Sequence, residues 1–94
     1  MNIEEKIAKI LIDKKLTIAT TESCTGGLLS SKLTDVSGSL AFVHLNFVTY
    51  SNDAKHKILG VSNETLEKFG AVSEECAEAM ANGLYEVTKC DVAL

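Results

Sequence analysis

Hydrophobic residues recur along this chain with two spacings, one typical of helices and one typical of strands. Near the N-terminus they repeat every three or four residues, whereas Leu16–Thr20 and Leu40–Ser51 are short, largely apolar runs. Serines and glycines separate these segments and indicate where helices begin and end. The expected helices run from Asn2 to residues 13–15, from Ser23 to about Thr34, between Ser51 and Gly60, between Ser62 and Gly70, and from Ser73 past Val87, and the expected strands are 16–20, 40–51 and the start of 91–94.

The apolar faces of these elements predict which side of each is buried. The segment 40–51 is substantially apolar on both faces, as in a strand that is covered on both sides. The helices have narrower apolar stripes at helical spacing. These stripes are Ile3, Ile7, Ile10 and Leu11 in the first helix and Ala77, Met80, Ala81, Leu84 and Val87 in the last. Helices alternating with such strands predict an α/β fold, a three-layer α/β/α sandwich with a mostly parallel sheet.

Polar residues follow the first two strands at the point where each strand ends. They occupy residues 20–25 and 49–52, and ligands of parallel α/β sheets bind beyond these carboxyl ends. The first cluster continues into two glycines and a helix, an order that predicts an anion-binding turn. The residues of this turn are Ser23, Thr25, Gly26 and Gly27. An ordinary helix start, with Thr21 or Ser23 as the N-cap, is the alternative.

Composition narrows the class of protein without identifying a function. The 94 residues fit a single domain, and the net charge of −4 with scattered Lys and Arg argues against a nucleic-acid partner. No apolar run reaches the length of a membrane span, and the acidic N-terminal sequence is unlike a signal peptide. We therefore expect a cytoplasmic protein that is not bound to a membrane. Cys24, Cys76 and Cys90 are widely spaced, which is typical of reduced thiols and gives no metal-binding pattern.

Five linked motifs give the sequence a family pattern. They are Thr21–Gly27 (TESCTGG), Leu33–Ser39 (LTDVSGS), Phe47–Lys55 (FVTYSNDAK), Leu59–Val61 (LGV) and Gly70–Glu75 (GAVSEE). Their order and spacing resemble the C-terminal domain of CinA-type competence/damage-inducible proteins, whose stand-alone members are nicotinamide mononucleotide deamidases. The resemblance extends essentially from residue 16 to residue 94.

The resemblance implies hydrolysis of the carboxamide of nicotinamide mononucleotide, which yields nicotinic acid mononucleotide and ammonia. It also implies a serine nucleophile paired with a lysine base, with no metal or other cofactor. By position, Lys55 matches the family's lysine. Ser23 matches a serine that supports the substrate or the oxyanion, and Tyr50 lies at the mouth of the site. The substrate is expected to contact the turn residues as well, namely Thr25, Gly26 and Gly27.

Two departures from the family pattern bear on activity. Leu40 stands where the family has its nucleophilic serine. Ser39, a further catalytic candidate, is displaced by one residue, which on a strand would point its side chain to the other face. The second departure is length, because residues 1–94 match only about the first three-fifths of a domain of roughly 160 residues.

The sheet is therefore expected to be incomplete at its C-terminus. We expect impaired or absent activity from this chain alone. A homo-oligomer or a completing partner chain is expected to cover the open sheet, with a small nucleotide as the substrate. The alternatives are a nucleotide- or phosphate-binding module without catalysis and a structural remnant that acts through protein association.

Overall fold

The helices and strands follow the order expected from the sequence. The computed structural model describes residues Met1 to Leu94. Its helices are α1 (Ile3–Lys14), α2 (Leu28–Thr34), α3 (Asn52–Leu59), α4 (Asn63–Phe69) and α5 (Glu74–Thr88), its strands are β1 (Ile18–Glu22), β2 (Val43–Val48) and β3 (Val92–Ala93), and a 3-10 turn, Ser39–Ala41, precedes β2. None of the helices combines the length and apolar character that a membrane crossing requires.

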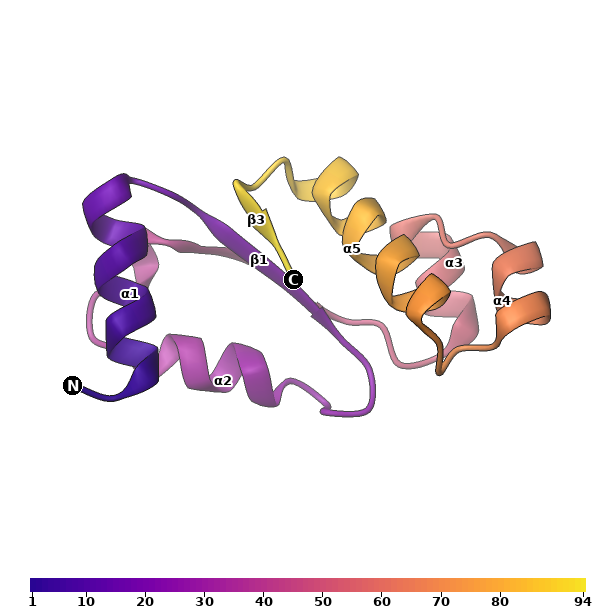
Figure 1. Cartoon of the computed structure of the whole chain (residues 1–94), viewed down its shortest axis with the longest axis horizontal. Coiled ribbons are helices and arrows are strands. Elements are labelled where there is room, and N and C mark those ends of the chain that lie inside the picture. The colour runs from indigo at the N-terminus through magenta and orange to yellow at the C-terminus, as the bar shows by residue number, and fades with distance from the viewer.

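The three strands form one parallel sheet with β1 in the middle, in the order β2-β1-β3, and Figure 1 shows β3 beside β1. Successive side chains of β1 point to opposite faces. Ile18 packs with residues of α1 and α2, whereas Ala19 packs with residues of α3 and α5. Helices therefore cover both faces of the sheet. The predicted α/β fold, a three-layer sandwich with parallel strands, is confirmed.

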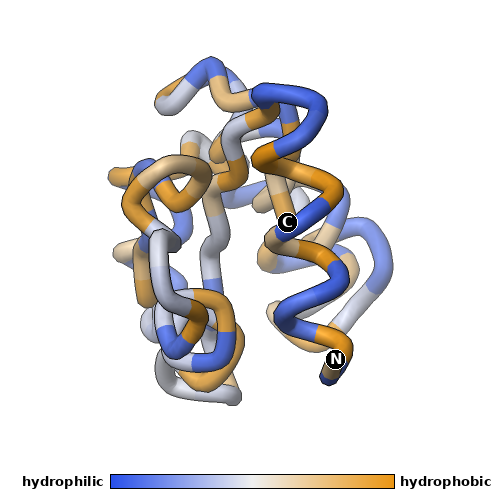
Figure 2. Tube along the Cα trace, turned by 90° about the vertical axis from the view of Figure 1, so that its left-hand side faces the viewer, coloured by the Kyte–Doolittle hydropathy of each residue, from blue (hydrophilic) through white to orange (hydrophobic).

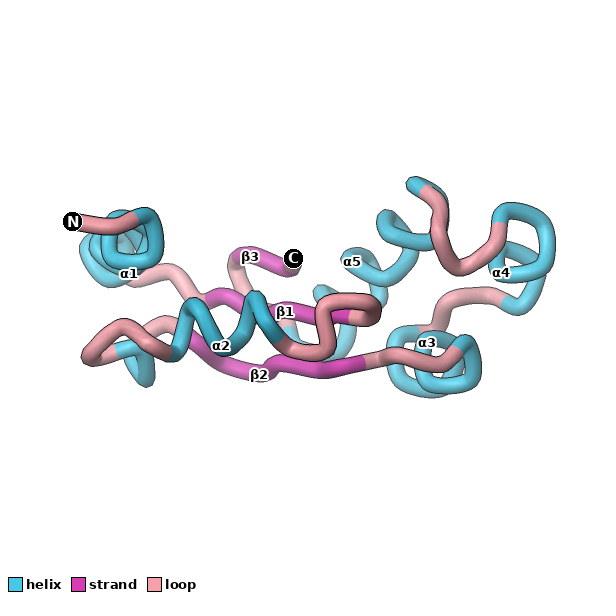
Figure 3. Tube along the Cα trace, turned by 90° about the horizontal axis from the view of Figure 1, so that it is seen from below, coloured by secondary structure: helices cyan, strands magenta, loops and turns pink.

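Two apolar clusters form the core, one on each face of the sheet. The first consists of Ala8, Leu11, Ile18, Leu33 and Phe42, and the second of Ala19, Leu59, Val61, Cys76, Met80, Leu84 and Cys90. Figure 3 shows α2 running alongside β1 and β2, with α3, α4 and α5 gathered toward the other end of the molecule. The two clusters thus join the sheet to helices that lie at opposite ends of the fold.

Helix α1 buries a different face from the one predicted. Ala8 and Leu11 are buried, whereas Ile3, Ile7 and Ile10 are exposed. Hydrophobic and hydrophilic positions alternate around the turns of α1, which begins at the N label of Figure 2. The isoleucines were thus wrongly predicted to be buried. Because α1 packs chiefly against α2, a narrow strip containing the small Ala8 is enough to make the contact.

Strand β2 is shorter and less covered than the predicted strand 40–51. Gly38 has a φ of 85° and begins the 3-10 turn that contains Leu40. The strand lies at an edge of the sheet, and Leu45 and Val48 are exposed. The expectation that both of its faces are covered is therefore wrong.

The predicted serine caps are confirmed. Ser51, Ser62 and Ser73 each accept a hydrogen bond from the backbone N–H three residues further along. Each cap satisfies one of the N–H groups that a helix leaves unpaired at its start. The apolar stripe predicted for α5 is right only in part, because Met80 and Leu84 are buried while Ala77 and Val87 are exposed.

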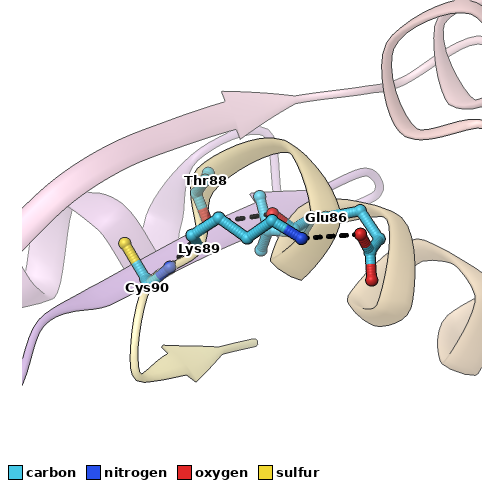
Figure 4. A network of polar contacts seen from close by, with 5 residues as sticks. Glu86, Thr88, Lys89 and Cys90 are labelled. Carbon is cyan, nitrogen blue, oxygen red and sulfur yellow. Dashed lines mark hydrogen bonds and ion pairs between the residues drawn. The ribbon is translucent and has the colours of Figure 1, made fainter.

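The end of α5 is fixed by a small network that leads the chain into β3 (Figure 4). Thr88 Oγ1 donates to the carbonyl oxygen of Leu84 at 2.8 Å and accepts from the N–H of Cys90 at 3.3 Å. Lys89 takes the left-handed conformation, with φ 55°, and its amine donates to Glu86 at 2.7 Å. This hydrogen bond raises the pKa of the Lys89 amine. The reversal directs Cys90 into the core ahead of β3.

Candidate functional site

A buried lysine lies beyond the carboxyl end of the sheet. Lys55 lies on α3 and is only 2% exposed. Its Nζ donates to the backbone carbonyl of Tyr50 at 2.7 Å and to Ser23 Oγ at 3.2 Å. The three ion pairs of the protein involve other lysines, so this amine is buried without a carboxylate partner. A buried amine that contacts a serine hydroxyl is a candidate for proton transfer to and from that hydroxyl.

The parallel pairing of β1 and β2 explains why Ser23 meets Lys55. The two strands stay paired to their last residues, so Ser23 and Tyr50 leave the sheet at the same edge. Ser51 then caps α3, and Lys55 lies in the first turns of that helix. The expected convergence of Ser23, Lys55 and Tyr50 at the strand ends is confirmed.

The turn after β1 presents free backbone donors beside Ser23. The N–H groups of Ser23, Cys24, Thr25 and Gly27 make no hydrogen bond within the protein, whereas that of Gly26 donates to the Ser23 carbonyl oxygen. Both glycines have positive φ, 64° for Gly26 and 111° for Gly27, and residues other than glycine rarely adopt such values. The turn is therefore able to receive a negatively charged oxygen through its own N–H groups.

Glu22 is a site residue that sequence reasoning missed. It is 5% exposed, and its carboxylate accepts from the N–H groups of Leu29 at 2.6 Å and Ser30 at 3.0 Å. It also accepts from the hydroxyls of Thr25 and Ser30, both at 2.8 Å. Burial by itself raises the pKa of the Glu22 carboxyl, but these hydrogen bonds outweigh it and hold the pKa below its usual value. The sequence signal was present, since an acidic residue stands directly between a buried strand and a glycine-rich helix start.

The bonds of Glu22 change both interpretations of this segment, the anion-binding turn and the ordinary helix start. Helix α2 begins at Leu28, and its N-cap is Gly27, which has no side-chain cap, so neither Thr21 nor Ser23 caps it. The free N–H groups at the start of α2 were expected to receive an anion, but the Glu22 carboxylate fills that position. The segment 23–27 is a turn that precedes the helix, and only its own N–H groups are free.

Tyr50 contributes its backbone to the site and its ring to the surface. Its carbonyl oxygen accepts from Lys55, and the residue is 72% exposed. Beneath it, the hydroxyls of Thr21 and Thr49 bond to each other at 2.8 Å and tie the ends of β1 and β2 together. This hydrogen bond stabilises the ends of the two strands, which Ser23 and Tyr50 follow in the chain.

The structure separates Ser39 from the other candidates. Ser39 Oγ donates to the Thr34 carbonyl oxygen at 3.4 Å, and the neighbouring Leu40 is 93% exposed. Ser39 precedes β2 while Lys55 follows it, and six strand residues span about 20 Å. Within one chain, β2 therefore holds Ser39 at the opposite end of the sheet from Lys55, as expected from its displacement, and a catalytic role for Ser39 stays a prediction.

Two hollows of the surface do not contain Lys55. One, of about 540 Å³, lies between α1 and the residues around Asp35, and the other, of about 250 Å³, is apolar and lies between Thr21, α5 and β3. The larger hollow contains neither the buried lysine nor the serine beside it. We place the site by its chemistry, at the turn 23–27 and Lys55, with the smaller hollow next to it.

Comparison with known families and curated proteins places the chain in a family. A family model described as the CinA C-terminal domain matches residues 1–94. The chain belongs to the CinA C-terminal domain family. It is 53% identical over 94 residues to a CinA-like protein of Chloroherpeton thalassium and 51% identical over 92 residues to one of Chlorobium limicola. It covers 22% and 21% of those two proteins, so it spans about a fifth of the length of the curated relatives it matches.

Solved structures share the fold. A competence-damaged protein (CinA) superfamily protein from Escherichia coli has a TM-score of 0.92 and 41% identity, and the chain covers 52% of it with 96% of its own length. The competence/damage inducible protein CihA from Agrobacterium tumefaciens has a TM-score of 0.88 and 44% identity, and the chain covers 53% of it with 95% of its own length. This CinA domain chain therefore corresponds to about half of each solved relative.

Proposed function

We propose that this CinA domain chain carries the nucleophile and base of an amidohydrolase that acts on nicotinamide mononucleotide. The observation that carries the proposal is the 3.2 Å contact between Lys55 Nζ and Ser23 Oγ, made by a lysine that is buried without a carboxylate partner. The amide substrate is proposed from the family resemblance of the motifs around these residues. The family resemblance gives the serine at this position a supporting role and places the nucleophile at position 40, which is Leu40 here. Because the hydroxyl that Lys55 contacts is that of Ser23 and not one from the 3-10 turn, the proposal departs from the resemblance and gives Ser23 the role of nucleophile.

The proposed reaction moves one proton between serine and lysine. In the resting arrangement Lys55 Nζ donates to Ser23 Oγ, whose own hydroxyl donates to the Tyr50 carbonyl oxygen at 3.4 Å. Catalysis requires the neutral amine and a hydroxyl rotated toward it, so that Nζ accepts the proton as Oγ attacks the carboxamide carbon. Lys55 then returns the proton to the departing ammonia. Water hydrolyses the acyl-serine by the reverse sequence of proton transfers and restores Ser23.

The free N–H groups of the turn are the proposed oxyanion donors. Those of Ser23, Cys24, Thr25 and Gly27 have no partner in the protein and lie next to the nucleophile. Donors already in place stabilise the charge that develops on the carbonyl oxygen without reorganisation. The exposed ring of Tyr50 is proposed to contact the nicotinamide at the mouth of the site. The proposed chemistry uses protein groups and water alone.

A binding module is the second candidate. The chain spans about half of the solved relatives, so nearly half of each relative has no counterpart among its residues. The free N–H groups of the turn are able to hold a phosphate or carboxamide oxygen even without turnover. In that case the chain is a nucleotide- or phosphate-binding module without catalysis.

The test is to incubate the purified chain with nicotinamide mononucleotide and to follow both ammonia release and thermal stability. Ammonia release that is lost in Ser23→Ala and Lys55→Met and kept in Ser39→Ala supports the hydrolase. A rise in melting temperature without ammonia supports the binding module, because a ligand of the native state stabilises it. Absence of both responses excludes both functions for this chain.

A further inference from the structure

We propose that Glu22 is a positioning residue for Ser23, because its carboxylate holds the turn 23–27 in the shape that keeps the Ser23 hydroxyl beside Lys55. This inference rests on the proposed function, in which Ser23 is the nucleophile. Glu22 precedes Ser23 directly in the chain, but its bonds are to Thr25 and to the start of α2. It therefore acts through the turn and not on the substrate.

The bonding of Glu22 is complete within the protein. Oε1 accepts from Thr25 Oγ1 and the Leu29 N–H, and Oε2 accepts from the N–H and the hydroxyl of Ser30. All four donors are neutral, and no lysine forms an ion pair with Glu22. A carboxylate that is 5% exposed and bonded in this way has one geometry, since loss of any partner leaves a buried charge less well compensated.

The turn has few other restraints. Within it, the backbone makes two hydrogen bonds, from Gly26 to the Ser23 carbonyl oxygen and from Leu28 to the Thr25 carbonyl oxygen. Gly26 and Gly27 add conformational freedom, which has to be removed for the turn to hold one shape. The four bonds of Glu22, the last residue of β1, reach the middle of the turn at Thr25 and the start of α2 at Leu29 and Ser30. Together with the bond of Ser23 Oγ to the Tyr50 carbonyl oxygen, they hold the turn against the end of the sheet and keep Ser23 beside Lys55.

The position of Glu22 also determines where a ligand's negative charge is accepted. The N-terminus of a helix attracts anions through its unpaired N–H groups and its dipole. In α2 the protein's own carboxylate occupies that position and bonds two of those N–H groups. An incoming oxyanion is therefore left with the free donors of the turn, which lie next to Ser23.

Replacement by glutamine tests this role while preserving the shape of the side chain. Glu22→Gln replaces one oxygen by an NH2 group, which then faces N–H and hydroxyl donors and accepts no bond from them. We expect kcat for nicotinamide mononucleotide to fall on the order of 10²-fold, as for a misplacement of about 1 Å, with a smaller change in KM. Glu22→Asp retains the charge with a shorter reach, and we expect it to restore part of kcat. Glu86→Gln, which removes an exposed carboxylate of α5 that pairs with Lys89, is the matched control.

A readout independent of activity separates this inference from the proposed function. In the wild type and Glu86→Gln, a nuclear Overhauser contact between the Ser23 β-protons and the Lys55 ε-protons is expected, and in Glu22→Gln it should be lost while the circular dichroism of the fold remains. If the wild type releases no ammonia, the proposed function fails and this contact alone decides the role of Glu22.

Thr25→Val provides a second variant if Glu22→Gln does not fold. It removes one of the four bonds of Glu22 and leaves the start of α2 bonded, so we expect a weaker contact between Ser23 and Lys55. The inference is overturned if the folded variant, Glu22→Gln or in its place Thr25→Val, keeps the Ser23–Lys55 contact at wild-type intensity.

Discussion

Lys55 occupies a position that costs free energy to fill, because its amine leaves water without a carboxylate to compensate it. Two hydrogen bonds, to Ser23 and to the Tyr50 carbonyl oxygen, offset part of that cost. A methionine of similar length would fill the same space without the polar group. Retention of a buried amine at this cost is consistent with a role in chemistry rather than in stability.

We therefore predict that Lys55→Met separates stability from activity. The free energy of unfolding should stay within about 1 kcal/mol of the wild type, since the lost hydrogen bonds and the removed desolvation cost nearly cancel. Ammonia release should fall at least about 10²-fold, the usual contribution of a general base. Urea unfolding and steady-state kinetics measure the two effects. Lys55→Ala is the control for volume, and it should lose about 2–4 kcal/mol through the cavity it leaves. A Lys55→Met protein with wild-type turnover would contradict the assignment.

The Glu22 carboxyl predicts a specific dependence of stability on pH. Its pKa in the folded protein lies below the ordinary value of 4.5, so the folded state holds the ionised form more firmly than the unfolded state does. The stabilisation is therefore complete above the unfolded pKa and is lost as the pH falls through the folded pKa. We predict that the difference in unfolding free energy between the wild type and Glu22→Gln is greatest near neutral pH and shrinks below about pH 4.5. Urea titrations at several pH values measure it, and a difference that stays constant down to pH 3 or so would exclude this linkage.

At the scale of the elements, features that depend on neighbouring residues could be predicted from the sequence, whereas features that depend on residues of other elements could not. Ser51, Ser62 and Ser73 were predicted as caps because each cap bonds to its own helix. The predicted start of α2 was wrong. Its first N–H groups bond to Glu22, which lies in β1, and no rule of sequence spacing links a strand residue to the start of the next helix. The buried face of α1 was also mispredicted, since the sequence of a helix does not say how much of it a neighbour covers.

Helices α3 and α5 approach closely at Gly83. A Cβ atom at this position would overlap the carbonyl oxygen of Leu59, which is backbone and cannot move aside. We predict that Gly83→Ala destabilises the protein by about 1–3 kcal/mol, although alanine is favoured over glycine in a helix by about 1 kcal/mol. Urea unfolding measures the change. Asn82→Ala, at the exposed neighbouring position, should be neutral or stabilising. Equal stabilisation by both substitutions would show that the helices separate without cost.

At the scale of the whole molecule, the candidate site was predictable to the extent that it follows from topology. Parallel strands bring their carboxyl ends to one edge, so the segments 20–25 and 49–52 could be placed together from strand order, whereas Lys55 was singled out by the family resemblance. Ser39 could not be placed in the same way, because the length of the 3-10 turn and the start of β2 depend on packing around Phe42. The free N–H groups of the turn likewise become visible only when every backbone bond is known.

We propose that the molecule self-associates in solution. The fold is elongated, 42 × 22 × 18 Å, and β2 and β3 are both edge strands of a three-stranded sheet. Edge strands leave backbone groups unpaired, and the hollow beside β3 is lined mainly by apolar side chains. The residues that line it are Thr21, Ala77, Met80, Ala81, Ala93 and Leu94. Covering about 100 Å² of apolar surface contributes roughly 2.5 kcal/mol, which is large against the stability of a small domain.

We predict that Ala81→Lys, in this hollow, weakens association, because a charged side chain would have to be buried in the interface. Sedimentation velocity over a range of micromolar concentrations should show a dimer or larger species for the wild type and a shift toward monomer for the variant. Ile10→Lys, on the exposed side of α1 at the other end of the molecule, is the matched control and should associate like the wild type. A wild-type chain that folds cooperatively and remains monomeric at these concentrations would exclude self-association. Association lost equally in both variants would place the interface elsewhere, since only the Ala81 substitution alters the apolar hollow beside β3.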